Sequence, residues 1–141
     1  MIRAHFDAIS VLLDPIQSPP TGLLVYTAAL DDAWTPLDPP QPMQYPYAVM
    51  RSSGMPVTSD RLAQWSNRLD GLIYMTGVGL VYDQAAWVLE KIRSVLLDAV
   101  PVVSGRSVAP LALVDSSTIE ADRDVSPPLF HGVDVYRLFS V

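Results

Sequence analysis

The sequence LIYMTGVGLVY (residues 72–82), followed at once by DQAAWVLEKIRSVLLD (residues 83–98), decides the fold of this 141-residue chain. The first segment is an almost unbroken run of apolar and β-branched residues, bounded upstream by Asp70-Gly71. Its length and composition predict a central strand that is covered on both faces. We expect the rest of the chain to pack around this strand.

The second segment has the periodicity of a helix. Its apolar residues recur at steps of three and four and predict one buried stripe, made of Ala85, Val88, Leu89, Ile92 and Leu96. Asp83 is placed to cap the helix through its side-chain oxygen. Gly77 and Gly79 fall on one face of the preceding strand, where the missing side chains would let a helix approach closely. The two segments therefore predict a strand that feeds directly into a packed helix.

Further elements are expected on both sides of this unit. A first helix that stops before Pro15 is marked by an apolar face of Ile2, Phe6, Ile9 and Leu13. The lone His5 beside this stripe is interpreted as a packing or surface residue. Strand candidates follow at residues 23–28, 47–51, 111–114, 118–123 and 132–141. The expected fold class is α+β, in one domain spanning residues 1–141. It has a mainly antiparallel sheet of about four to six strands and two helices packed on one face.

Composition limits the classes of function. Half of the residues are apolar, 17% are charged and the net charge is −6, which argues against a protein that mainly grips phosphates. No apolar run reaches the roughly 18 residues that span a bilayer, so no membrane partner is expected. The first residues do not have the pattern of a signal or transit peptide. The chain has no cysteine, which excludes thiolate chemistry.

A long proline-rich loop is expected between Asp31 and Pro46, and it carries Trp34 and Tyr45. These aromatics could anchor the loop on this subunit or on another. Stepping about 100° per residue places Trp87 opposite the buried stripe of its helix, near Leu97. Aromatic residues are enriched at interfaces, so we name Trp34, Tyr45, Trp87 and Leu97 as candidates for a subunit or partner interface. The alternative is that a loop of the same chain covers Trp87.

The search for chemistry gives no positive sign of an enzyme, and no cofactor is expected. Glu120, Asp122 and Asp124 alternate along one strand candidate and could bind a hard cation, but we favour their interpretation as a solvated strand face. Gly77-Val78-Gly79 resembles a nucleotide loop, but Tyr82 stands where the dinucleotide fingerprint needs a glycine. With two histidines, the chain also offers little choice of a general base.

Several segments resemble the tail terminator proteins of long-tailed, siphovirus-type bacteriophages. The helix sequence at residues 83–93, following a strand that ends in glycine, is similar to the second helix of that family. The ending DVSPPLFHGVDVYRL, residues 124–138, is similar to its closing loop and strand. The first helix at residues 3–13 and the strand beginning PYAV at residues 46–49 occur in the expected order.

The resemblance implies a structural protein of the virion, assembled in the host cytoplasm. Tail terminators form rings, typically homo-hexamers, that cap the head-proximal end of the tail tube and stop its polymerisation. The implied partners are other copies of the chain, the tail tube protein, the tape measure protein and the head–tail connector. DNA would pass through the lumen without specific binding, and an acidic lining would keep phosphates from sticking.

Two other functions stay open. The first is another ring protein of the head–tail neck, such as a completion protein. The second is a metal-dependent hydrolase that uses Glu120, Asp122 and Asp124. The chain differs from compact family members in the length and proline content of residues 31–46. This arm could dock on the tail tube, clasp the next subunit or cover a face of its own subunit, and we favour the clasp.

Overall fold

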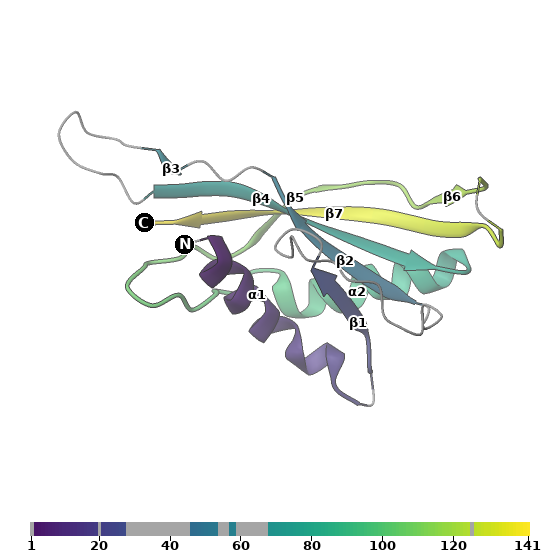
Figure 1. Cartoon of the computed structure of the whole chain (residues 1–141), viewed down its shortest axis with the longest axis horizontal. Helices are drawn as coiled ribbons and strands as arrows, with labels where there is room; N and C mark the ends of the chain where they lie inside the picture. Colours follow the sequence, from purple (N-terminus) through teal and green to yellow (C-terminus); the bar gives the residue numbers. More distant parts are fainter. Residues whose placement is uncertain (1, 20, 28–45, 54–56, 59–67, 125) are drawn as a thin grey trace, which may run out of the picture.

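The computed structural model describes residues 2–19, 21–27, 46–53, 57–58, 68–124 and 126–141. The elements in chain order are α1 (Ile2–Gln17), β1 (Leu24–Thr27), β2 (Tyr47–Ser52), β3 (Val57–Thr58), β4 (Arg68–Gly79), α2 (Tyr82–Leu96), β5 (Ala112–Ser116), β6 (Glu120–Asp122) and β7 (Leu129–Ser140). Both helices lie on the same side of the sheet (Figure 1). The expected α+β class and the position of the two helices are confirmed.

The sheet is mainly antiparallel, as expected. Its strand order is β1-β2-β4-β7-β5, with β3 paired to β4 and β6 paired to β7. The described residues form seven strands, against an expected four to six, because the two-residue β3 lies in a segment without an alternating pattern. One pair departs from the antiparallel rule, since β1 and β2 run parallel. The two long strands β4 and β7 run side by side through the middle (Figure 1).

The prediction that the central strand is covered on both faces is wrong. Burial alternates along β4: Leu69, Ile73 and Met75 are at most 1% exposed, whereas Leu72 and Tyr74 are half-buried. The first set faces the helices, and we call that side the helix-covered face. We call the opposite side the second face. Leu72 and Tyr74 are apolar on the second face too, which is why the strand reads as an unbroken apolar run.

Helix α2 packs on β4 through the expected stripe, since Ala85, Val88, Leu89, Ile92 and Leu96 are all buried. Gly77 and Gly79 permit this close approach. A Cβ atom at Gly79 would lie 2.5 Å from the Cβ of Gln84, and one at Gly77 would lie 3.1 Å from side-chain atoms of Val88 and Leu89. Both the stripe and the close approach at the glycines are thus confirmed.

The start of α2 differs from the expectation. Asp83 lies inside the first turn, and the N-cap residue is Val81, which makes no side-chain cap. The carboxyl end of β4 runs into the helix so tightly that Gln84 provides the local contact instead. Its Oε1 accepts the backbone N–H of Leu80 at 2.8 Å. This bond holds the turn in one conformation.

Helix α1 continues through Pro15 to Gln17, so the expected stop before Pro15 is also wrong. The apolar stripe that begins with Phe6, Ile9 and Leu13 continues to Ile16, which is only 5% exposed. Burial of Ile16 offsets the backbone hydrogen bond that proline cannot donate. The backbone N–H of Leu23 then donates to the carbonyl of Ile16 at 2.9 Å and closes the turn into β1.

The closing part of the chain contains two short strands and one long one. β5 and β6 each pair with β7, and β7 begins three residues before the expected position 132. β5 forms an edge of the sheet, and its register shifts between Leu113 and Asp115, so Val114 is bulged and 51% exposed. Among the described residues, neither helix has the length and hydropathy needed to cross a bilayer.

Candidate subunit and partner interface

Two of the four candidate residues lie in the part of the chain that the structure describes. Trp34 and Tyr45 lie outside the described residues. Trp87 is half-buried on α2 and packs partly against the core, with the Lys91 ammonium 5.9 Å from its ring centroid. Leu97 is 48% exposed at the end of the same helix, about 15 Å from Trp87 along the axis. A contact between Trp87 and another chain therefore stays a prediction.

A cluster of exposed apolar residues lies at each end of α2. At the start of the helix, Leu80, Val81 and Tyr82 are 39%, 52% and 54% exposed. After the helix, Leu97, Val100 and Val102 are 48%, 49% and 88% exposed. We call these the entry cluster and the exit cluster. Leu80, Val81 and Tyr82 are consecutive in the chain, and contiguous exposed apolar surface is typical of surfaces that meet a partner. In the sequence, the entry cluster corresponds to the apolar run after Gly79. The sequence does not show that these residues are exposed.

The entry cluster is held rigidly. The backbone N–H of Leu80 donates to Gln84 Oε1, and the backbone of Gly79 packs closely against Gln84 and Ala85. A surface that is already fixed loses little conformational entropy when it binds. The entry cluster is thus suited to a contact that must form with defined geometry.

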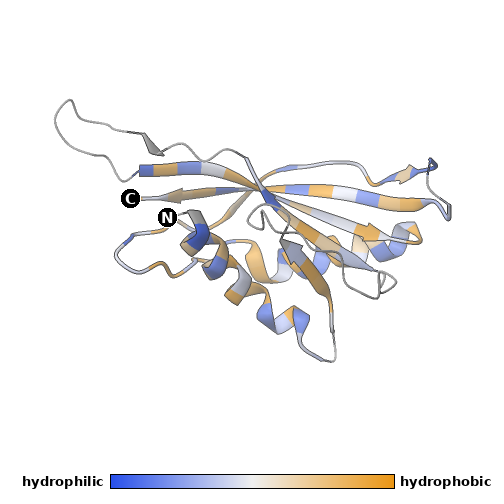
Figure 2. Ribbon diagram, in the orientation of Figure 1, coloured by the Kyte–Doolittle hydropathy of each residue, from blue (hydrophilic) through white to orange (hydrophobic). Residues whose placement is uncertain are grey.

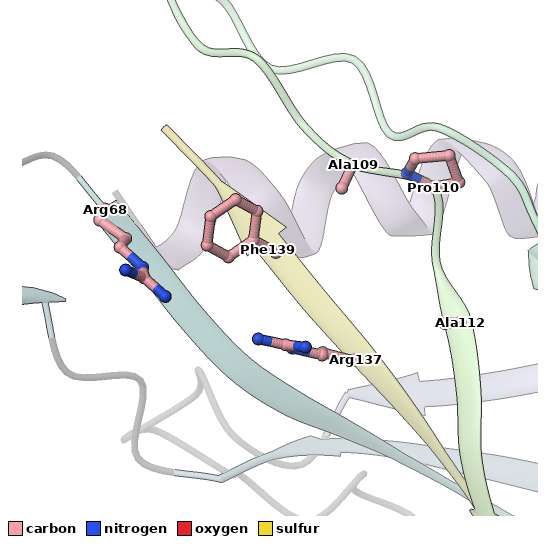
Figure 3. A pocket seen from close by; sticks show the side chains of 6 residues that line it. All are labelled: Arg68, Ala109, Pro110, Ala112, Arg137 and Phe139. Carbon is pink, nitrogen blue, oxygen red and sulfur yellow. The ribbon is translucent and has the colours of Figure 1, made fainter.

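A small pocket lies on the second face, near the C-terminal end of β7 (Figure 3). Its volume is about 350 Å³, and it is lined by Arg68, Ala109, Pro110, Ala112, Arg137 and Phe139. Figure 3 shows the two arginine side chains on either side of the approach to the Phe139 ring. Their guanidinium carbons lie 5.2 Å (Arg68) and 5.9 Å (Arg137) from the ring centroid. We call this the arginine pocket.

Asp70 binds Arg137, one of the two arginines that line the arginine pocket. Arg137 Nε donates to Asp70 Oδ1 at 2.9 Å, and its Nη2 donates to Oδ2 at 2.7 Å. This hydrogen bonding lowers the pKa of Asp70; partial burial opposes the shift and the charges of Arg137 and Arg68 add to it. The same bonds raise the pKa of Arg137. The pocket thus has two guanidinium groups, one of them bound by Asp70, beside apolar walls.

The opposite end of the second face is acidic. Glu120 and Asp122 of β6 pair with His131 and Leu129 of β7, and Asp122 Oδ1 accepts the backbone N–H of Asp124 at 3.0 Å. Over the part of the chain that the structure describes, no three His, Cys, Asp or Glu residues gather as metal ligands. Glu120, Asp122 and Asp124 therefore do not assemble the cation site on which the hydrolase hypothesis depended.

Two buried polar groups are used to hold elements together. Asp134 is fully buried on the helix-covered face and accepts from Arg93 Nε at 2.6 Å, from Arg93 Nη2 at 2.8 Å and from Ser116 Oγ at 2.7 Å. The hydrogen bonding to Asp134 raises the pKa of Arg93, against an opposing effect of burial. This network ties α2 to β7 and β5.

His5 is the second buried polar group. Its burial confirms the interpretation of His5 as a packing residue. Its Nε2 lies 2.8 Å from Ser140 Oγ, which also accepts from Arg106 Nε at 2.9 Å. These contacts join α1 to the end of β7 and to the loop before β5. A third buried polar side chain, Tyr136, has its pKa raised, mainly by burial.

No protein-family model and no curated protein sequence matches the chain. Among solved structures, the chain is similar to one in the virion of a native gene transfer agent (GTA) particle. The superposition covers 93% of this chain and 84% of that chain, with a TM-score of 0.58 and 15% sequence identity. At this identity the likeness shows a common fold.

Proposed function

We propose that the protein is a structural component of a phage-type virion, a tail terminator that forms a ring on the head-proximal end of the tail tube. The observation that carries this proposal is the fold shared with a chain of a virion particle over 93% of the present chain. The resemblance of residues 83–93 and 124–138 to tail terminators supports the same assignment; residues 83–93 lie in α2, and residues 129–138 lie in β7.

The chemistry of the described residues supports a structural role. The buried Asp134 and His5 are both engaged in contacts between elements of the fold. A protein that works by shape needs surfaces to meet its partners, and the entry and exit clusters supply apolar surface at two separate places. Two different surfaces on one subunit are what a head-to-tail contact requires, and such a contact closes into a ring when the rotation is right.

In the proposed assembly, copies of the chain form a hexamer that stops polymerisation of the tube. One rim of the ring contacts the last ring of tube protein and the tape measure protein, and the other rim presents a surface to the head–tail connector. The net charge of −6 suits a lumen through which DNA slides without specific binding. The protein would assemble in the host cytoplasm and remain in the virion.

The test has two parts. Light scattering on the purified protein, with negative-stain microscopy, should give the mass and outline of a hexameric ring, alone or on isolated tail tubes. A phage that lacks the gene should make tails of uncontrolled length. Normal tails joined to heads in that phage would overturn the terminator role. Binding to portal complexes, with no binding to tube ends, would assign the protein to another ring of the neck.

A further inference from the structure

The loop that follows α2 presents two valines to solvent. Burial alternates along residues 100–103, since Val100 and Val102 are 49% and 88% exposed whereas Pro101 and Val103 are buried. Val102 is the most exposed of the large apolar residues that the structure describes. The two buried residues pack inward and thereby fix the outward direction of the valines between them. The exit cluster is therefore a built surface of the fold.

Backbone hydrogen bonds hold this loop in place. The N–H of Asp98 donates to the carbonyl of Leu111 at 2.9 Å, and the N–H of Leu111 donates to the carbonyl of Ala99 at 2.8 Å. Beyond the valines, the N–H of Arg106 donates to the carbonyl of Val103 at 3.2 Å. The exit cluster is thus fixed, as the entry cluster is, and fixed apolar surfaces lose little conformational entropy on binding.

The two clusters lie at opposite ends of α2 and expose similar amounts of apolar surface (Figure 1). The 15-residue helix separates them by about 20 Å, so they do not touch within one copy. From the exposed fractions, each cluster offers apolar surface on the order of 200 Å². A standard contact buries about 800 Å² on each partner, and a little more than half of that area is apolar. Each cluster therefore supplies about half of the apolar area of one standard contact.

A second copy of the chain is the partner that accounts for both clusters at once. If the entry cluster of one copy packs on the exit cluster of the next, every copy in a closed ring buries both. The two surfaces differ, so this contact runs head to tail and continues from copy to copy. A pair of entry clusters, or a pair of exit clusters, would form a dimer and leave the other cluster in water.

We infer that the exit cluster of one copy packs against the entry cluster of the next copy, with Val102 at the centre of the contact. This inference rests on the proposed ring and names the surfaces that build it. Neither cluster contains a charged residue, so the burial of apolar area supplies the affinity. Side chains that become fully desolvated at the centre of an interface contribute most to binding, and Val102 has the most surface to bury.

Crosslinking between engineered cysteines tests this contact, because the chain has no cysteine of its own. Val102→Cys with Val81→Cys places one thiol in each cluster. Treated with a bifunctional maleimide, in solution or on isolated tail tubes, this variant should give a ladder of covalent multimers on a denaturing gel. Each single variant should give none. The matched control is Val102→Cys with Val11→Cys, since Val11 is 65% exposed but lies on α1, outside both clusters, and this control should give no ladder.

A second variant measures how much Val102 contributes. Val102→Asp places a charge in the apolar contact and should weaken assembly on the order of a hundredfold. Val11→Asp adds the same charge elsewhere on the surface and should leave assembly unchanged. Light scattering over a range of protein concentrations measures assembly in solution, and sedimentation with tail tubes measures it there. Circular dichroism confirms that both variants are folded.

The outcomes separate this inference from the proposed function. The inference is overturned, and the ring stands, if wild-type rings form but the variant with a cysteine in each cluster gives no ladder, or the control gives the same ladder. Rings of unchanged mass in Val102→Asp that no longer bind tail tubes would assign the exit cluster to the tube and overturn it too. Crosslinked dimers from a single-cysteine variant would indicate pairing of like clusters, against the inference. A wild-type chain that stays monomeric both in solution and on tail tube ends would overturn the inference and the proposed function together.

Discussion

Two arginine–aspartate pairs lie on opposite faces of the same strand, β7. On the helix-covered face, Arg93 binds Asp134, whose side chain is 0% exposed. On the second face, Arg137 binds Asp70, whose side chain is 37% exposed. Both pairs are bidentate and both have distances below 3 Å. The two pairs therefore have similar geometry and differ in their exposure to water.

The difference indicates how the two faces divide their tasks. The buried pair joins α2 to β7 and, through Ser116, to β5, so its loss would leave a buried charge without its partner. The exposed pair is screened by water and adds little to stability. It fixes the position of two side chains on a surface. We therefore expect changes on the helix-covered face to affect folding more than changes on the second face.

The largest expected effect comes from removing core volume on one side of β4. Ile73→Ala should lower the free energy of unfolding by about 3–4 kcal/mol, since Ile73 is 1% exposed and the deletion leaves a cavity. Leu72→Ala, one residue away on the second face, should cost less than half as much. Urea denaturation of both variants measures the difference. Equal losses would show that the two faces are packed alike.

Next in size is the buried ion pair. Asp134→Asn should destabilise the fold by about 2–3 kcal/mol, below the range for a fully buried pair because the Arg93 side chain is 41% exposed. Asp70→Asn is the matched control and should leave the urea midpoint almost unchanged. If Asp70→Asn proves the more destabilising of the two, the proposed division between the faces is wrong.

A smaller effect is expected where α2 approaches β4. Gly79→Ala should cost about 1–3 kcal/mol, because the new Cβ would meet the backbone nitrogen of Ala85 at 2.9 Å. At Gly77 the nearest atoms lie farther away, at 3.1 Å for the side chains of Val88 and Leu89 and 3.2 Å for the backbone oxygen of Ala85, so Gly77→Ala should cost less. Thermal unfolding of the two variants ranks them. The reverse order would show that the helix can shift away from the end of the strand.

The smallest effect concerns pH and the exposed pair. The pKa of Asp70 in the folded protein is held below its ordinary value of 3.8, so its contribution to stability is present above pH 3.8 and is lost as the pH falls through the folded pKa. Arg137→Gln should raise the pKa of Asp70 back toward 3.8, as measured by NMR titration of the carboxyl group. An unchanged pKa would mean that Arg137 is not its main partner in solution.

Much of the fold could be predicted because it depends on local periodicity. The buried stripe of α2 and the position of Gly77 and Gly79 follow from spacing alone. It could not be predicted that helices cover only one face of β4. Leu72 and Tyr74 are apolar on the second face, so the sequence of β4 looks like that of a strand buried on both faces. The parallel pairing of β1 with β2 depends on contacts between distant segments, and no local pattern encodes it.

The surfaces were less predictable than the fold. The arginine pocket unites Arg68 from the start of β4 with Arg137 and Phe139 from the end of β7, and only the register of these strands brings them together. Hydropathy varies along β7, as the blue and orange bands in Figure 2 show, but this pattern does not give the buried face, because the hydrophilic Asp134 is fully buried on the helix-covered face. Among the candidates from the sequence, Trp87 and Leu97 remain untested as interface residues.

The bulge at Val114 has a consequence for how copies of the chain can coexist at high concentration. A regular edge strand offers a row of backbone groups onto which a foreign strand can add, and such addition leads to fibres. At β5 the register breaks between Leu113 and Asp115, and the aspartate adds a charge. The edge strand β5 is therefore a poor template for strand addition. Newly made subunits at high concentration in a cell are thus less prone to aggregate through this edge.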